Sequence, residues 1–197
     1  MKFFFFFGRK FGKRIFNKAY VFINQERYDD AIHAYKESFR IEPYFAPAYL
    51  NLSELYRRQK KNNSAISVLQ QGLNAIPDNG QLNHALGLAF IRANKRDKAI
   101  KYLHLSTKVS PQNSRFHYVY GLSIENLQPE KAQLAINKAF QISNNPQYLF
   151  TLCEMQIKQK SAKAMQCLQS LSEVAPQNII KQLKQQLENN MKPKGNL

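Results

Sequence analysis

The residues of this chain that could perform acid–base, nucleophilic or metal chemistry are few and scattered. Its histidines and cysteines are His33, His84, His104, His117, Cys153 and Cys167. The histidines form no H-E-x-x-H zinc motif, and no serine or cysteine lies in a sequence motif that would pair it with a general base. There is also no C-x-x-C pair and no G-x-x-x-x-G-K-[ST] phosphate loop. We therefore predict that the protein is not an enzyme, with no catalytic residues, no metal site and no cofactor.

The two cysteines fall on apolar faces of one predicted helical hairpin. Two cysteines are too few for the disulfide framework of a small secreted domain. We interpret Cys153 and Cys167 as small buried hydrophobic residues. The alternative is a disulfide between them.

The composition is that of a folded and strongly basic protein. Of its 197 residues, 44% are hydrophobic, which is enough for a substantial core. The formal net charge of +16 would favour anionic partners such as lipid, nucleic acid or an acidic protein face. The simpler interpretation, which we favour, is a solvated lysine-rich surface.

The elements that must position these residues are indicated by an internal repeat. One copy has the framework Leu86-Gly87, Phe90, Ala99, Leu103, Ser106 and Pro111. The same framework occurs 34 residues earlier as Leu52-Ser53, Tyr56, Ala65, Leu69, Gly72 and Pro77. Apolar residues at helical spacing predict two helices in each copy, and the proline ends the second because it steers the preceding residue away from helical backbone.

Five such repeats, a final helix and two tails account for the whole chain. The repeats cover about 12–45, 46–79, 80–113, 114–145 and 146–176. Residues 177–191 are apolar on one side only, which predicts the capping helix that a stack of repeats needs for solubility. Residues 1–11 and 192–197 are predicted to be tails.

The L-G-x-x-F, A-x-x-x-L, S, P framework at this period resembles the tetratricopeptide repeat, over about residues 12–176. The resemblance implies an all-α fold, a right-handed α-α superhelix (solenoid) of about five hairpins with a C-terminal capping helix. It also implies a non-catalytic scaffold or adaptor for protein–protein interaction. Where the family often has tryptophan at the fourth repeat position, this chain has Ile15, Tyr49, Asn83, His117 and Tyr148. Asn83 and His117 depart from the pattern, and we expect weaker packing there.

The segments A-P-A-Y-L-N-L-S-E-L-Y-R-R-Q and L-N-H-A-L-G-L are also similar to bacterial arrays at the C-terminal end of larger proteins. Some of those proteins carry multihaem cytochrome-like domains. No C-x-x-C-H haem motif occurs here, so no haem role is carried over. The similarity indicates a bacterial protein and a detached array.

Family geometry implies that the first helix of each hairpin lines a concave face through repeat positions 2, 5, 9 and 12. This face would bind a peptide or amphipathic helix of a protein partner, an acidic partner included. The alternative is that several of these side chains pack between neighbouring helices. The predicted binding residues, here called the groove positions, are Phe16, Tyr20, Ile23, Leu50, Glu54, Arg57, His84, Leu88, Ile91, Arg115, Tyr118 and Leu122.

A second candidate surface is basic. Nucleic-acid binding would require aromatic side chains among its cations, and they are missing, so an acidic protein or lipid surface fits better. The alternative is that the cations complement helix C-terminal dipoles. The surface, here called the basic rim, consists of Arg57, Arg58, Lys60, Lys61, Arg92, Lys95, Arg96 and Lys98, from the turns of repeats two and three.

The N-terminus carries five phenylalanines, Phe3 to Phe7, followed by basic residues. This run is too short to span a bilayer and shorter than the apolar core of a secretory signal, so we expect a cytoplasmic location. It could dip into an anionic membrane surface. We favour a tail outside the repeats. The second functional hypothesis is therefore a peripheral module that uses the basic rim and the N-terminus on an anionic membrane or acidic surface.

Overall fold

The computed structural model describes residues 2–191, with side chains from Phe11 to Asn190. The predicted C-terminal tail, residues 192–197, lies outside the described residues. Over the described part every regular element is an α-helix, and the chain divides into two compact units, Met1–Val109 and Ser110–Leu197. The first unit holds α1 (Lys2–Asn24), α2 (Tyr28–Ile41), α3 (Ala46–Arg58), α4 (Asn62–Ala75), α5 (Gly80–Arg92) and α6 (Arg96–Val109). The second holds α7 (Ser114–Ile124), α8 (Pro129–Ser143), α9 (Pro146–Lys158), α10 (Ala164–Ser172) and α11 (Gln177–Met191).

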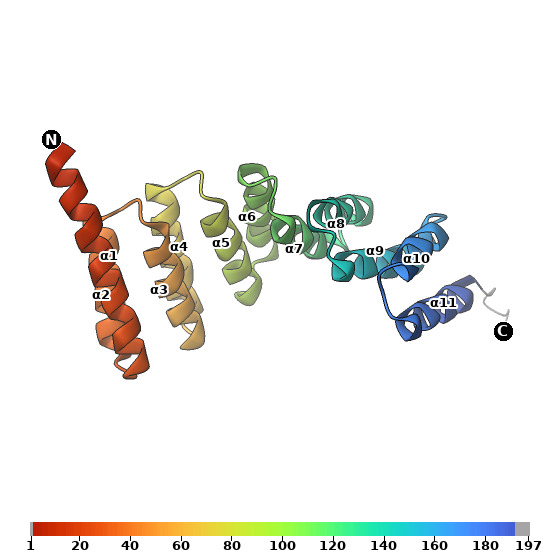
Figure 1. Cartoon of the computed structure of the whole chain (residues 1–197), viewed down its shortest axis with the longest axis horizontal. Helices are drawn as coiled ribbons and strands as arrows, with labels where there is room; N and C mark the ends of the chain where they lie inside the picture. Colours follow the sequence, from red (N-terminus) through yellow and green to blue (C-terminus); the bar gives the residue numbers. More distant parts are fainter. Residues whose placement is uncertain (1, 192–197) are drawn as a thin grey trace. The chain divides into compact units, whose positions relative to one another are not determined.

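Within each unit the helices pair in chain order, α1 with α2, α3 with α4, α5 with α6, α7 with α8 and α9 with α10 (Figure 1). Short connections force consecutive helices into antiparallel hairpins. Several helix starts follow ordinary capping chemistry. The Asn79 side chain accepts a hydrogen bond from the Leu82 amide, and Pro129 occupies the first turn of α8, where its missing N–H costs nothing.

Helix α1 begins earlier than the sequence indicated. We expected residues 1–11 to be a tail, whereas α1 starts at Lys2. The physical reason is that extending an existing helix fixes one residue per hydrogen bond and so costs little, while starting one is costly. Gly12 lies against Glu42 and Ser38, at the C-terminal end of α2. The first turns of α1 therefore extend past the end of its hairpin partner.

Close approach of the two helices in a hairpin depends on a small residue at the eighth position of the first helix. In α7 this residue is Gly121, and a Cβ there would lie 2.6 Å from Ile136 Cγ1 and 3.0 Å from the Ala132 carbonyl oxygen. In α5 it is Gly87, whose added Cβ would lie 2.6 Å from Leu103 Cγ. The repeated small residue thus sets how closely α-helices pack.

The fourth residue of α3, α5 and α7 makes a recurring hydrogen bond. We expected weaker packing at Asn83 and His117, but both replace the lost aromatic contact with a polar one. Each donates to the carbonyl of the proline six residues earlier; at His117 the carbonyl can only accept, so the ring nitrogen carries the proton. The three bonds are Tyr49 Oη to Pro43 O at 3.1 Å, Asn83 Nδ2 to Pro77 O at 3.4 Å and His117 Nε2 to Pro111 O at 3.0 Å.

Each unit buries its own apolar core. In the first unit, Tyr35 and Leu52 are almost fully buried, and the Phe39 and Tyr49 rings stack with centroids 4.3 Å apart. In the second, the core extends to α11, which buries Ile180 and Leu183 and contacts α9 and α10. The remaining positions of α11 are mostly exposed polar residues. Helix α11 therefore covers the end of the apolar core with a wet outer face, as a capping helix must.

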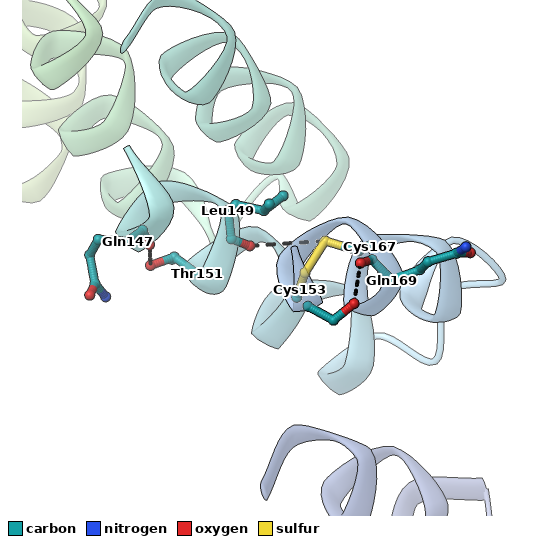
Figure 2. The surroundings of a disulfide bond; sticks show 7 residues. Gln147, Leu149, Thr151, Cys153, Cys167 and Gln169 are labelled. Atoms are coloured by element: carbon teal, nitrogen blue, oxygen red, sulfur yellow. Dashed lines mark hydrogen bonds between the residues drawn. A yellow bond between two sulfur atoms is a disulfide. The ribbon is translucent and has the colours of Figure 1, made fainter. Parts of the chain in front are cut away.

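The cysteine interpretation was wrong. Cys153 of α9 and Cys167 of α10 form a disulfide with their Cα atoms 5.5 Å apart, as Figure 2 shows. Both residues are buried, as expected, but as a cross-link and not as separate hydrophobic side chains. The reason is position: Cys153 is the eighth residue of α9, the small-residue position at which paired helices come closest. That approach brings two cysteines within disulfide reach.

Candidate partner-binding site

In the first unit the predicted groove positions divide into exposed and packed side chains. Tyr20 and Ile91 are 50% and 43% exposed and are therefore accessible to a partner. Ile23, Leu50 and Leu88 are half-buried, as is Phe16, which contacts the rings of Tyr20, Tyr35 and Phe45. His84 is 7% exposed and is one of the buried residues of α5.

The polar groups of this surface are dominated by arginine. Glu54 accepts hydrogen bonds from Arg57 at 2.6 Å and Arg58 at 3.1 Å. The Arg57 bond is the main reason why the pKa of Glu54 falls to about 2. Burial lowers the pKa of Arg92, and the charge of Arg57 lowers it further, so cations from α3 and α5 lie close to each other. One carboxylate among three guanidinium groups leaves this surface net positive.

In the second unit, two residues of α7 and Glu125, the residue that follows the helix, line an open cavity of about 730 Å³, here called the groove cavity. Tyr118 and Leu122 were predicted groove positions, and Glu125 follows them one helical turn later. The remaining wall comes from α9 and α11. Arg115 is exposed but does not line the groove cavity. The other lining residues are Gln147, Thr151, Glu154, Met155, Ile157, Lys158, Gln186, Asn189 and Asn190.

Several contacts hold the groove cavity in shape. The Tyr118 hydroxyl lies 3.2 Å from Thr151 Oγ1, and the Tyr118 ring stacks on Tyr148 with centroids 4.4 Å apart. Lys158 Nζ forms an ion pair with Glu125 at 3.2 Å. Because these contacts join α7 to α9, the cavity wall is built before any ligand binds.

Sequence reasoning named no groove position in repeat five. It aligned Tyr148 with the fourth position of the repeat, but the fourth residue of α9 is Leu149, which is 5% exposed. Pro146, at the first turn of α9, was the signal that could have corrected this alignment. The corrected register places Gln147, Glu154 and Ile157 at groove positions 2, 9 and 12, and all three line the groove cavity.

The basic rim is exposed at each of its eight positions. Lys60 and Lys61, from the α3–α4 turn, line one cavity of about 480 Å³ together with Lys95, from the α5–α6 turn. The first turn of α4 forms another wall of this cavity, and it contains no acidic residue. Arg57 and Arg58, in contrast, are already engaged by Glu54.

Across residues 2–191, no helix is long and apolar enough to cross a bilayer. Within the same part of the chain, no three histidine, cysteine, aspartate or glutamate side chains gather as metal ligands would.

Comparison with known proteins identifies the repeat. Residues 22–87 match the family model described as the tetratricopeptide repeat. No curated protein matches the sequence. This match supports the predicted family resemblance over residues 22–87, and the solved structures below confirm the all-α helical-repeat fold.

Three solved structures that share this fold are distant from the chain in sequence. YrrB, described as a TPR protein with an unusual peptide-binding site, has 15% identity and a TM-score of 0.67, over 87% of this chain and 90% of its own. MamA from Desulfovibrio magneticus RS-1 has 17% identity and a TM-score of 0.65, over 92% of this chain and 97% of its own. PilF of Pseudomonas aeruginosa has 14% identity and a TM-score of 0.69, over 93% and 90%.

Proposed function

Because this chain carries tetratricopeptide repeats and has their fold, we propose that it is a non-catalytic scaffold that binds a segment of a protein partner. The segment is a peptide or an amphipathic helix, and it lies on the groove positions of the first helices of the hairpins. The observation that carries the proposal is the exposure of large apolar side chains at those positions: Tyr20, Ile91 and Leu122 are 50%, 43% and 39% exposed. YrrB, which shares the fold, is described as having a peptide-binding site.

A preformed surface suits this role. The groove positions stand on helices whose opposite sides are packed into a core, so the protein loses little conformational freedom on binding. The ordering cost falls mainly on the partner segment. Apolar side chains of a partner segment would bury the exposed ring of Tyr20 and the side chain of Ile91 in the first unit, or the side chain of Leu122 in the second. Such contacts supply most of the binding energy in protein interfaces.

The charge of the first unit favours an acidic group on the partner segment. Arg57 and Arg92 approach each other, and the repulsion between them is relieved when a carboxylate binds between or beside them. Glu54 neutralises only part of this charge.

The test uses two matched pairs of substitutions in the full chain. Ile91→Asp with Leu122→Asp places two charges on the groove positions. Leu134→Asp with Met165→Asp places two charges on α8 and α10, where the side chains are 69% and 62% exposed. All four sites are exposed enough that the fold should survive, and circular dichroism checks this.

We expect partners recovered by wild-type protein in affinity capture to be lost with the groove variant and kept with the control variant. Recovery of the same partners by both variants would place the binding surface elsewhere and refute the proposal.

A second candidate function is association with an anionic membrane or another acidic surface through the basic rim and the N-terminus. The specific observation in its favour is that Lys60, Lys61 and Lys95 share one cavity wall. Each lysine at an anionic surface contributes about 1 kcal/mol, so removing three should weaken binding roughly a hundredfold.

Vesicle sedimentation tests this second function. Wild-type protein should sediment with vesicles that contain phosphatidylserine and stay in solution with neutral vesicles. The variant Lys60→Gln, Lys61→Gln, Lys95→Gln should stay in solution with both. Equal sedimentation with neutral and anionic vesicles would exclude the electrostatic mechanism.

The location remains part of this proposal. The sequence favours the cytoplasm, but a Cys153–Cys167 disulfide is typical of oxidising compartments. Thiol alkylation of cells before lysis distinguishes the two: a cytoplasmic protein would be alkylated at both cysteines, and a protein in an oxidising compartment would not.

A further inference from the structure

The groove cavity differs in charge from the protein as a whole. The chain carries a net charge of +16. The charged residues that line the groove cavity are Glu125, directly after α7, and Glu154 and Lys158 of α9. Helix α11 contributes only the amide side chains of Gln186, Asn189 and Asn190. Two carboxylates and one ammonium group give this wall a net negative charge, in contrast to the positive surface around Arg57 and Arg92 in the first unit.

The ammonium group does not serve both carboxylates. Lys158 Nζ lies 3.2 Å from Glu125 Oε1. Among the described residues, the Glu154 carboxylate takes part in no salt bridge and no side-chain hydrogen bond. Burial raises the pKa of Glu154, and the charge of Glu125 raises it further, so the two carboxylates repel each other across the cavity. The Glu154 carboxylate is exposed and is therefore accessible to a cation of a bound ligand.

The shape of the groove cavity suits a long cationic side chain. Its volume of about 730 Å³ is larger than one side chain requires, and it is open to solvent on one side. Tyr118 contributes an aromatic ring fixed by Tyr148 and Thr151, and Leu122 contributes apolar surface that is 39% exposed. Arginine and lysine combine an apolar stem, which such walls bury, with a charge that carboxylates and ring faces attract.

We propose that the groove cavity takes an arginine or lysine side chain of the partner segment, with its charge beside Glu154 and Glu125 and its stem against Tyr118 and Leu122. This inference rests on the proposed function, since it names the chemistry that one part of the groove recognises. It assigns a binding role to Glu154, a residue outside the predicted groove positions.

The experiment begins with a random peptide library selected on the immobilised full-length protein. The selected peptides are synthesised in two forms, one with arginine and one with citrulline, which keeps the shape of arginine without its charge. Affinities are measured by titration calorimetry for wild type, Leu122→Ala, Glu154→Gln, Lys158→Gln and Glu173→Gln. Glu173 is an exposed residue outside the groove cavity, so Glu173→Gln removes the same charge at a position that does not contact the proposed site.

We expect the selected peptides to be rich in arginine or lysine. Glu154→Gln should weaken binding of the arginine peptide about three- to tenfold and leave the affinity of the citrulline peptide unchanged. This magnitude is expected for a partly exposed charge pair next to an aromatic ring. Lys158→Gln removes the ion pair of Glu125 and should strengthen binding of the arginine peptide about two- to fivefold. A loss of structure could not increase the affinity in this way. Glu173→Gln should change neither.

The outcomes separate this inference from the proposed function. Peptides that require Leu122 but lack arginine and lysine, or that bind Glu154→Gln as tightly as wild type, overturn the inference and leave the groove proposal standing. Peptides that bind Leu122→Ala as tightly as wild type, or a library that yields no binder, overturn both.

Discussion

Substitution of Gly121 by alanine tests whether the eighth position of the first helix controls hairpin packing. The new Cβ would lie 2.6 Å from Ile136 Cγ1 and 3.0 Å from the backbone oxygen of Ala132. The Ile136 side chain is fully buried and cannot rotate into solvent, and the carbonyl of α8 can move only with its helix. Relief therefore requires α7 and α8 to separate, which loosens the contacts around them.

Two effects of opposite sign determine how much Gly121→Ala changes the free energy of unfolding. Forcing an additional methyl group into a packed core typically costs about 1–3 kcal/mol. Alanine in place of glycine inside a helix returns about 1 kcal/mol through its better helix propensity. Since the clash involves backbone as well as a side chain, we take the upper half of the packing range, about 2–3 kcal/mol. After the return of about 1 kcal/mol, the free energy of unfolding should fall by about 1–2 kcal/mol.

The assay is urea unfolding followed by far-UV circular dichroism, because the chain contains no tryptophan to report by fluorescence. A double-mutant cycle with Ile136→Ala makes the test specific. Ile136→Ala alone should cost about 2–5 kcal/mol, and the double variant should be more stable than the sum of the single effects by about 1 kcal/mol or more, because the new methyl enters the space left by isoleucine. A neutral or stabilising Gly121→Ala substitution would refute this packing argument.

Three further predictions concern stability and are measured by the same unfolding assay. Replacing Cys153 and Cys167 by alanine removes a cross-link with a sequence separation of 14; the free energy of unfolding should fall by about 2–3 kcal/mol, and reduced wild type should match the variant. Glu26 has a left-handed backbone with φ of 59°, so Glu26→Gly should stabilise by about 0.5–1 kcal/mol, while Gln25→Gly, one residue earlier, should not. The pKa of Glu54 is about 2 in the folded protein against 4.5 ordinarily, so its ion pairs stabilise above pH 4.5 and this stability is lost as the pH falls through about 2. Its side chain is 43% exposed, so Glu54→Gln should cost only about 1 kcal/mol or less near neutral pH and nothing near pH 2.

The hairpin architecture could be predicted from the sequence because its determinants are local and repeated. In each repeat, the spacing of apolar residues indicates two helices. A small residue marks where the helices meet, and a proline follows the second helix. The buried alanines Ala65, Ala99 and Ala132 occupy the expected places in α4, α6 and α8. Repetition made these weak signals reliable, since each repeat confirms the register of the one before it.

The parts that could not be predicted are those where repetition fails. In repeat five the shorter spacing moved the apparent register by one residue, from Leu149 to Tyr148. No groove position was named in this repeat, so Glu154 stayed outside the predicted site, and Cys153 was interpreted as a buried hydrophobic residue although it stands at the eighth, close-contact position. Helix α1 begins ten residues before Gly12. An existing helix extends at little cost, and this extension requires no sequence motif that could have been recognised.

The register of α9 connects the disulfide to the proposed binding site. With 3.6 residues per turn, residues at intervals of three and four share one face of a helix. One face of α9 carries Leu149, Leu152, Cys153 and Gln156, and it packs toward α8 and α10. The opposite face carries Gln147, Thr151, Glu154 and Lys158, which line the groove cavity. A covalent bond on the first face limits rotation of α9 about its own axis, and this rotation is the motion that would turn Glu154 away from the cavity. The disulfide therefore stabilises the hairpin and also holds the proposed recognition carboxylate in position.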